Sequence, residues 1–343
     1  MESSETRFCE SADGVKIAYA VIGEGPPLIY VGLWTYSLDY QGHRLLTGLR
    51  DELARERSVV NFDRRGIGAS EREIRELSLE AAVSDIDAVA DAAGFSRFDL
   101  VGTYDGAHVA ASYCVRHPER VRRVVFLGLS RSLSETYFPI FRGIADFIEA
   151  NWETAKLAIA AWMLRGGPTE SLQWAVDIVE RAISAEAAKR YMAFIVTLDS
   201  KEILPSISAP TLVVHWRDDP NFSLHEARAA SALMSESTFL VVASPNPLWM
   251  GGETVLEPIL EFLREDEPGE RPDALTEREV EILALLAGGR SNQQIARELS
   301  ISTRTAERHI GNIYLKIGAH NRAEATAYAN QNRIVVSPPP AGR

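Results

Sequence analysis

Short runs of apolar, often β-branched residues recur between positions 8 and 263, and they alternate with helical stretches. Several runs are continuously apolar, as is usual for strands covered by helices on both faces. This alternation predicts a mostly parallel, doubly wound α/β sheet. The predicted strands are Val15–Val21, Leu28–Gly32, Val59–Asp63, Phe98–Gly102, Val124–Gly128, Thr211–Trp216 and Thr238–Val242.

Near the end of the chain, apolar and polar residues instead recur with the period of an α-helix. Polar residues stand at three predicted helix starts with an acid or amide three positions later, which is the pattern of a capping box. These pairs are Thr276 with Glu279, Ser291 with Gln294, and Asn321 with Glu324. The pattern predicts four short helices over residues 276–287, 291–299, 302–317 and 321–331.

The third of these helices has two different faces. Ala306, Ile310, Ile313 and Ile317 recur at helical spacing and predict a buried stripe. The other side holds donors and cations that suit phosphates and base edges. The candidate DNA-contacting residues are Arg304, Thr305, Arg308, His309, Asn312 and Lys316. Without further information, an ordinary solvated helix face explains this pattern equally well.

Motifs across residues 274–331 favour the DNA-binding interpretation. The segments Leu-Thr-x-Arg-Glu, Gly-x-Ser-Asn-x-x-Ile-Ala, Ile-Ser-x-x-Thr-x-x-x-His-Ile and Asn-Arg-Ala-Glu-Ala follow in order. Together they resemble the C-terminal DNA-binding domain of LuxR-type regulators. The resemblance implies that the helix from Ser302 enters the major groove of double-stranded DNA and that the last helix pairs subunits in a homodimer.

Charge is divided unevenly along the chain. The whole sequence has a net charge of −12, but residues 273–343 carry nine Lys/Arg against seven Asp/Glu. The remainder is therefore strongly acidic and should leave DNA contact to the small domain.

We expect a sensing domain over 1–264 with a cap at about 131–208, a linker over 265–273, a helix-turn-helix domain over 274–336 and a disordered tail over 337–343.

Cysteine content and the N-terminus restrict the class of protein further. Only Cys9 and Cys114 are present, without metal-ligand spacing, so neither a metal site nor a disulfide framework is expected. The first residues lack a basic and apolar signal, and no apolar run approaches membrane-spanning length. We expect a cytoplasmic protein that needs no cofactor and does not contact a membrane.

The larger part resembles the α/β-hydrolase family over nearly its whole length. The segments that carry this resemblance are Gly23–Leu28, Asn61–Ser70, His117–Val121 and Leu212–Asp219. They imply an α/β-hydrolase-like sheet with a helical cap inserted between Ser130 and Ser208. That insertion is rich in Phe, Trp, Tyr and Met side chains.

The catalytic positions implied by this resemblance are altered. The elbow Gly102-Thr103-Tyr104-Asp105-Gly106-Ala107 keeps the glycines of the sharp turn but has Tyr104 in place of a serine nucleophile. Aligning Trp249 with the aromatic residue that often follows the catalytic histidine places Asn246 at the histidine position, and an amide takes no proton at neutral pH. Asp219 keeps the position of the acid. We therefore expect no enzyme activity.

Three of the five histidines in this domain stand near the altered catalytic segments. His215 stands in a predicted strand and His108 one turn after the elbow, and both are expected to be structural. His43 lies near the region that usually forms the oxyanion hole. It is the one histidine placed to serve an altered active site.

Loss of catalysis leaves a pocket under the cap available for a ligand. We expect Trp34, Tyr104, Asn246 and Trp249 to line it, and a small, mostly apolar molecule to bind there. The sequence thus favours a ligand-responsive transcriptional regulator. Two alternatives stay open: an active ester or lactone hydrolase fused to a DNA-binding domain, and a large domain that serves only as a dimerisation scaffold.

Overall fold

The computed structural model divides the chain into two compact units, Met1–Phe262 and Leu263–Arg343. The residues that it describes are 5–38, 44–164, 171–219, 223–243, 253–264, 275, 277–299, 301–317, 319, 321–331 and 334. Within these residues, no helix combines the length and the hydropathy needed to cross a membrane.

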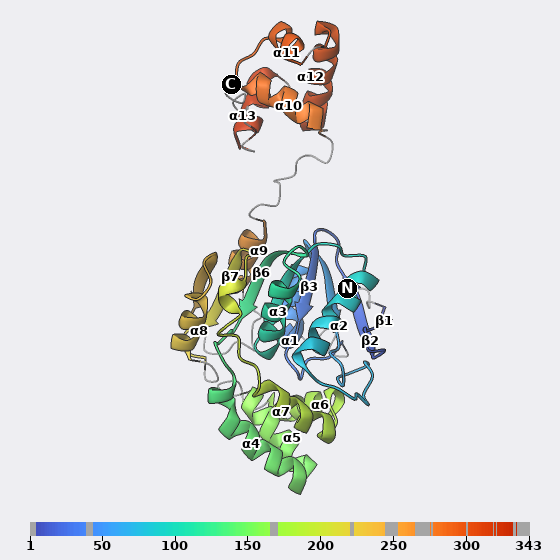
Figure 1. Cartoon of the computed structure of the whole chain (residues 1–343), viewed down its shortest axis with the longest axis vertical. Helices are drawn as coiled ribbons and strands as arrows, with labels where there is room; N and C mark the ends of the chain where they lie inside the picture. The colour runs from blue at the N-terminus through green and yellow to red at the C-terminus, as the bar shows by residue number, and fades with distance from the viewer. Residues whose placement is uncertain are drawn as a thin grey trace. The chain divides into compact units, whose positions relative to one another are not determined.

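The larger unit is built on an eight-stranded sheet with the order β1-β2-β4-β3-β5-β6-β7-β8 (Figure 1). The six strands from β4 to β8 in this order are parallel, while β2 runs antiparallel to both β1 and β4. The strands are β1 Arg7–Glu10, β2 Lys16–Ile22, β3 Pro27–Val31, β4 Ser58–Phe62, β5 Phe98–Thr103, β6 Val121–Leu127, β7 Thr211–Trp216 and β8 Ser237–Val242. The predicted α/β sheet is confirmed, and β1 is an edge strand that the pattern did not predict.

Apolar side chains explain why the central strands are buried. Every residue of β5 and β7 is buried. Strand residues such as Ile29, Leu100 and Val124 join Ile86 and Val109, from helices α2 and α3, in the largest apolar cluster. The helices outside the cap are α1 Arg44–Leu53, α2 Leu79–Ala92, α3 Asp105–Arg116, α8 Leu224–Ser231 and α9 Glu253–Arg264.

Four helices lie between β6 and β7 in the chain and form the cap (Figure 1). They are α4 Ser134–Ala150, α5 Trp152–Met163, α6 Leu172–Ala182 and α7 Ala185–Ile195. The chain enters and leaves the cap at one place, where Leu133 N donates to Leu198 O over 3.0 Å. Gly68 N also donates to Ala182 O over 2.8 Å, so the cap is fastened to the loop after β4. The helical cap predicted from the sequence is confirmed.

The smaller unit contains α10 Glu277–Ala287, α11 Asn292–Glu298, α12 Thr303–Ile317 and α13 Arg322–Gln331. Each begins or ends within one residue of its prediction. Ser291 and Gln294 form the predicted capping box, and Asn321 Oδ1 accepts from Glu324 N over 3.0 Å. Ala306, Ile310 and Ile313 are buried in the core of this unit and confirm the apolar stripe of α12.

Candidate functional site

The elbow between β5 and α3 has the sharp geometry that the sequence predicts. Tyr104 has φ 52° and is the single non-glycine residue with positive φ in the described part of the chain. Two glycines allow the turn to pack closely. A Cβ on Gly102 would lie 2.7 Å from Ala107 Cα, and one on Gly106 would lie 2.5 Å from Val31 O. The backbone therefore holds residue 104 in a strained position at the carboxyl edge of the sheet.

The Tyr104 side chain reaches across to the end of β7. Its hydroxyl donates to Asp219 Oδ2 over 3.2 Å, and the side chain is largely buried. A Cβ on Gly128, which has φ +73°, would lie 2.6 Å from the Tyr104 ring, so this ring packs directly on the backbone after β6. The residues at the nucleophile and acid positions are therefore bonded directly to each other. Asn246 and Trp249 lie outside the described residues.

Asp105, the first residue of α3, follows Tyr104 and bonds to the loop after β3. In this fold the oxyanion hole uses the N–H of the residue after the nucleophile and one from the loop after β3. Here Trp34 N, in the loop after β3, donates to Asp105 Oδ1 over 3.3 Å. A carboxylate thus already accepts from an amide of that loop.

Arg64 completes a buried ion pair with Asp105. Its Nη1 donates to Asp105 Oδ2, and both side chains are almost fully buried. Burial raises the pKa of the Asp105 carboxyl above its ordinary value, and the nearby Arg64 guanidinium opposes this rise. The pair joins the loop after β4 to the elbow.

Aromatic side chains of the cap cover this ion pair. Trp34 is 1% exposed, stacks on Tyr191 with ring centroids 6.2 Å apart, and meets Phe141 edge-on at 6.3 Å. The Arg64 guanidinium lies 5.3 Å from the centre of the Tyr191 ring. Trp34 and Tyr104 belong to one apolar cluster with residues of all four cap helices. The structure therefore brings together the two described residues that the sequence placed at the ligand site.

Sequence reasoning missed Arg64, Asp105 and Tyr191 as members of this site. Arg64 and Asp105 lie inside the quoted hydrolase-like motifs, and their opposite charges directly after two buried strands were the available signal. Tyr191 was noted only as one of many aromatic residues in the insertion. None of these residues has a role in the altered triad, so motif alignment did not draw attention to them.

The described histidines do not lie at the elbow bond. His108 is buried and its Nδ1 lies 2.7 Å from Ser200 Oγ, and burial lowers its pKa to about 4. His215 is fully buried within β7. Both therefore have the structural setting that was expected, while His43 lies outside the described residues. Among the residues that the structure describes, no group of three His, Cys, Asp or Glu side chains is placed to hold a metal ion.

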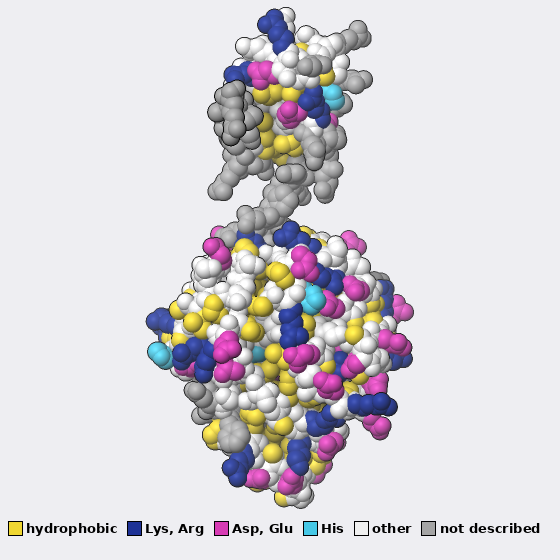
Figure 2. Space-filling view, viewed as in Figure 1, with side chains coloured by type: hydrophobic (Ala, Val, Ile, Leu, Met, Phe, Trp, Pro, Cys, Tyr) yellow, Lys and Arg dark blue, Asp and Glu magenta, His cyan; other side chains and the backbone are white. Residues whose placement is uncertain are grey.

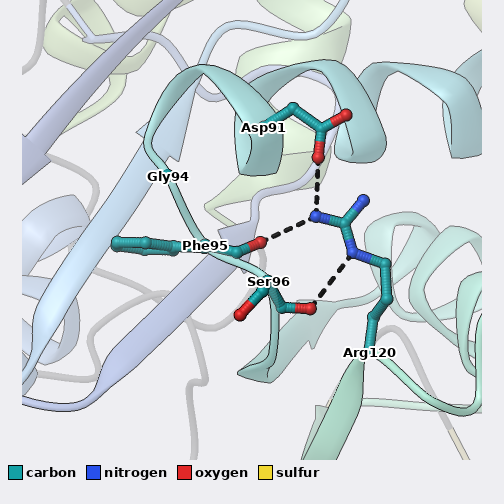
Figure 3. A pocket seen from close by; sticks show the side chains of 5 residues that line it. All are labelled: Asp91, Gly94, Phe95, Ser96 and Arg120. Carbon is teal, nitrogen blue, oxygen red and sulfur yellow. Dashed lines mark hydrogen bonds and ion pairs between the residues drawn. The ribbon is translucent and has the colours of Figure 1, made fainter.

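A shallow hollow lies at the opposite edge of the sheet. It is lined by Asp91, Gly94, Phe95, Ser96 and Arg120, which precede the amino ends of β5 and β6 (Figure 3). The Arg120 guanidinium donates to Asp91 Oδ1 and to Phe95 O, each over 2.7 Å. These contacts fasten a loop, and ligands of open α/β sheets bind at the carboxyl ends of the strands instead. The hollow is therefore a structural feature.

Helix α12 carries the candidate DNA contacts. Thr305 and His309 are half-buried beside the isoleucine stripe, and the Thr305 hydroxyl lies 2.7 Å from Ser302 Oγ at the start of the helix. Glu307 and Gly311 are exposed. The side chains of Arg304, Arg308, Asn312 and Lys316 lie outside the described part of the structure.

On the face of the larger unit drawn in Figure 2, side chains of both charges are interspersed.

Two protein families match different parts of the chain. Residues 273–329 match the family described as bacterial regulatory proteins, luxR family, and residues 39–246 match the α/β hydrolase fold. The chain is 30% identical over 202 residues to the transcriptional regulatory protein LiaR of Bacillus subtilis, a match that covers 56% of this chain and 92% of LiaR. It is 32% identical over 142 residues to the response regulator protein VraR of Staphylococcus aureus, covering 40% of this chain and 68% of VraR.

Solved structures of hydrolases resemble the larger unit. A hydrolase from Pseudomonas aeruginosa superimposes with a TM-score of 0.65 at 19% identity, covering 76% of this chain and 98% of that chain. The enol-lactonase of Burkholderia xenovorans gives a TM-score of 0.64 at 17% identity, covering 75% of this chain and 99% of that chain. At these identities the likeness establishes the fold alone.

Proposed function

This chain belongs to the bacterial regulatory proteins of the luxR family, its LuxR-type DNA-binding domain being joined to a domain of the α/β-hydrolase fold, and we propose that it is a ligand-controlled transcriptional regulator. The hydrolase-like domain binds a small, largely apolar molecule and does not turn it over. The C-terminal domain binds operator DNA as part of a homodimer. This arrangement needs neither a metal nor a cofactor.

The bond between Tyr104 and Asp219 is the observation that carries the proposal. A hydrolase of this fold requires a histidine between nucleophile and acid, because the imidazole takes the proton and the acid orients it. A direct contact of 3.2 Å between the two positions bypasses that step. The phenol is also a poor nucleophile near neutral pH, since its ordinary pKa is about 10.

The Asp105 carboxylate further opposes hydrolysis. Acyl transfer develops negative charge on the carbonyl oxygen, and preorganised N–H groups must stabilise it. In this chain the Trp34 amide already donates to Asp105. A developing oxyanion would have to compete with a carboxylate for that amide.

The cap cluster supports ligand binding in place of turnover. Trp34, Phe141 and Tyr191 converge above the elbow, at the edge of the sheet where ligands of this fold class bind. A ligand controls DNA binding only if it favours one arrangement of the protein over another. A coupling free energy of about 1–3 kcal/mol is enough to change DNA occupancy severalfold or more.

Two measurements on the full chain test this function. First, a panel of p-nitrophenyl esters and lactones is offered to the wild type and to the variants Tyr104→Phe and His43→Ala. We expect no turnover above background in any of them. Turnover by the wild type that either variant abolishes would replace the sensor with an active hydrolase.

Second, a library of small apolar molecules is screened by thermal unfolding and then by binding to an operator selected from random DNA. A ligand at one hundred times its Kd should stabilise the folded protein by about 2.7 kcal/mol. We expect at least one such compound to change operator affinity. A library without any stabilising member would favour a domain that serves only for dimerisation.

A further inference from the structure

Two buried N–H groups beside the elbow have no acceptor. Trp34 Nε1 and Arg64 Nη2 are both shielded from solvent, and neither makes a hydrogen bond within the part of the chain that the structure describes. Trp34 is 1% exposed and Arg64 is 4% exposed. A buried donor without an acceptor is unfavourable, and more so when the donor is charged. Such groups therefore mark a place where an acceptor binds.

Both donors belong to one small cluster. Trp34 and Arg64 bind the two oxygens of the same carboxylate, since Trp34 N donates to Asp105 Oδ1 and Arg64 Nη1 donates to Asp105 Oδ2. Both side chains also contact the ring of Tyr191. The side chains that carry the two free N–H groups thus lie against the same aromatic side chain of the cap.

The hydroxyl groups of Tyr191 and Tyr104 are engaged elsewhere. The Tyr191 hydroxyl donates to Arg65 O over 2.8 Å, and the Tyr104 hydroxyl donates to Asp219. Each Asp105 oxygen already accepts one hydrogen bond, from Trp34 N and from Arg64 Nη1. The acceptor that would satisfy both donors must therefore come from outside these side chains.

Charge selects the kind of acceptor. The positive charge of Arg64 is already neutralised by Asp105. Asp85, which also lies near Arg64, is itself paired with Arg65 at 2.7 Å, so the buried charges balance. A second carboxylate would add an uncompensated negative charge to a buried site, which is strongly unfavourable. An uncharged carbonyl oxygen accepts two hydrogen bonds without that penalty.

We propose that Trp34 Nε1 and Arg64 Nη2 form a subsite for the carbonyl oxygen of an uncharged, otherwise apolar ligand. This inference rests on the proposed function, because it names the chemistry of the molecule that the hydrolase-like domain binds. The donors are side-chain groups and differ from the main-chain amides of an oxyanion hole. The subsite therefore holds a carbonyl group without activating it for attack.

Three matched probes test the subsite by titration calorimetry on the full chain. Benzylacetone carries a ketone, hydrocinnamate carries a carboxylate of similar size, and butylbenzene carries neither group. We expect benzylacetone to bind about three- to tenfold more tightly than butylbenzene, which is the usual range for a net hydrogen bond. Hydrocinnamate is expected to bind most weakly.

The variant Trp34→Phe keeps an aromatic ring and removes the N–H donor together with part of the indole. We expect it to lower benzylacetone affinity to that of butylbenzene and to leave butylbenzene affinity unchanged. Arg64→Lys keeps the charge opposite Asp105 but removes the planar fork, and it should weaken benzylacetone binding in the same way. Trp152→Phe, the same exchange at a partly buried position of the cap, serves as the matched control and should change neither affinity.

The outcomes separate the subsite from the wider proposal. Equal binding of benzylacetone and butylbenzene, tightest binding by hydrocinnamate, or an unchanged ketone affinity in Trp34→Phe overturns the carbonyl subsite and leaves a purely apolar sensor in place. Binding by none of the three probes overturns the subsite together with the small apolar site of the proposed function.

Discussion

The Tyr104 hydroxyl donates to Asp219 Oδ2 over 3.2 Å and joins the elbow after β5 to the end of β7. In an active enzyme of this fold, an imidazole stands between these two positions. A tyrosine is long enough to make the contact by itself, because its hydroxyl extends well beyond the reach of a serine. In this chain the two positions are instead joined by a hydrogen bond between their own side chains.

Close packing of Tyr104 on Gly128 gives the first prediction. Gly128→Ala should destabilise the larger unit for two reasons: the residue has φ +73°, and the new Cβ would lie 2.6 Å from the Tyr104 ring. We expect a loss of about 1–2 kcal/mol from the backbone strain. Overpacking against the ring should add about 1–3 kcal/mol. Urea unfolding followed by far-UV circular dichroism measures the sum.

Gly14→Ala is the matched control for this prediction. Gly14 has a similar φ of +82°, and a Cβ there meets nothing within 4 Å. Gly14→Ala should therefore show only the loss of stability that comes from backbone strain. Placing Gly128→Ala in a Tyr104→Ser background should reduce its effect to the value of this control. An undiminished loss in that background would show that the Tyr104 ring does not lie against Gly128.

The Arg64–Asp105 pair leads to a second prediction. Asp105→Leu leaves the guanidinium of Arg64 buried without its carboxylate, which should destabilise the protein by about 3–5 kcal/mol. The double variant Arg64→Met with Asp105→Leu removes both charges and should be nearly as stable as the wild type. Chemical unfolding of the single and double variants provides a thermodynamic cycle. Equal losses of stability in the single and the double variant would mean that the pair contributes through packing and not through charge.

The order of strands explains why this pair was not predicted from the sequence. Trp34, Arg64 and Asp105 follow β3, β4 and β5, and the sheet order β4-β3-β5 brings the three loops together at one edge. The resemblance of short segments to the α/β-hydrolase family predicted the elbow and the positions of Tyr104 and Asp219, because each of these segments is a continuous stretch of sequence. A contact between residues 41 positions apart depends on tertiary structure, which periodicity does not contain.

Edge strand β1 was missed for a different reason. Arg7–Glu10 is only four residues long, and all but one of its residues are exposed. Short exposed strands at sheet edges lack the apolar run by which the other seven strands were predicted. In contrast, the helices of the small unit were predicted almost to the residue, because their capping residues and the apolar stripe of α12 can both be identified in the local sequence.

Buried His108 makes the stability of the larger unit depend on pH. Burial holds its pKa at about 4 in the folded protein, against an ordinary value of 6.5, and the charge of Asp199 only partly opposes the shift. The unfolded chain therefore binds a proton below pH 6.5 that the folded protein does not bind until about pH 4. The stabilisation present above pH 6.5 should be lost as pH falls to 4, by up to roughly 3 kcal/mol.

The variant His108→Asn isolates this contribution. Asparagine retains a polar group near Ser200 Oγ, the partner of His108 Nδ1, but does not titrate. The difference in unfolding free energy between wild type and variant should change between pH 6.5 and 4 and be constant above pH 7. A difference that is independent of pH across this whole range would contradict the assigned pKa.

The last prediction concerns the DNA-binding face of α12. Arg308→Ala and Lys316→Ala are expected to abolish operator binding without unfolding the small domain, since the buried side of α12 is formed by Ala306, Ile310 and Ile313. Each variant that removes a phosphate contact should also reduce the dependence of log affinity on log salt by about one unit. Glu307→Gln, at an exposed position of the same helix, is the control and should bind DNA at least as well as the wild type. Fluorescence anisotropy over a range of salt concentrations measures both quantities, and unchanged affinity in both alanine variants would place the DNA contact on another face.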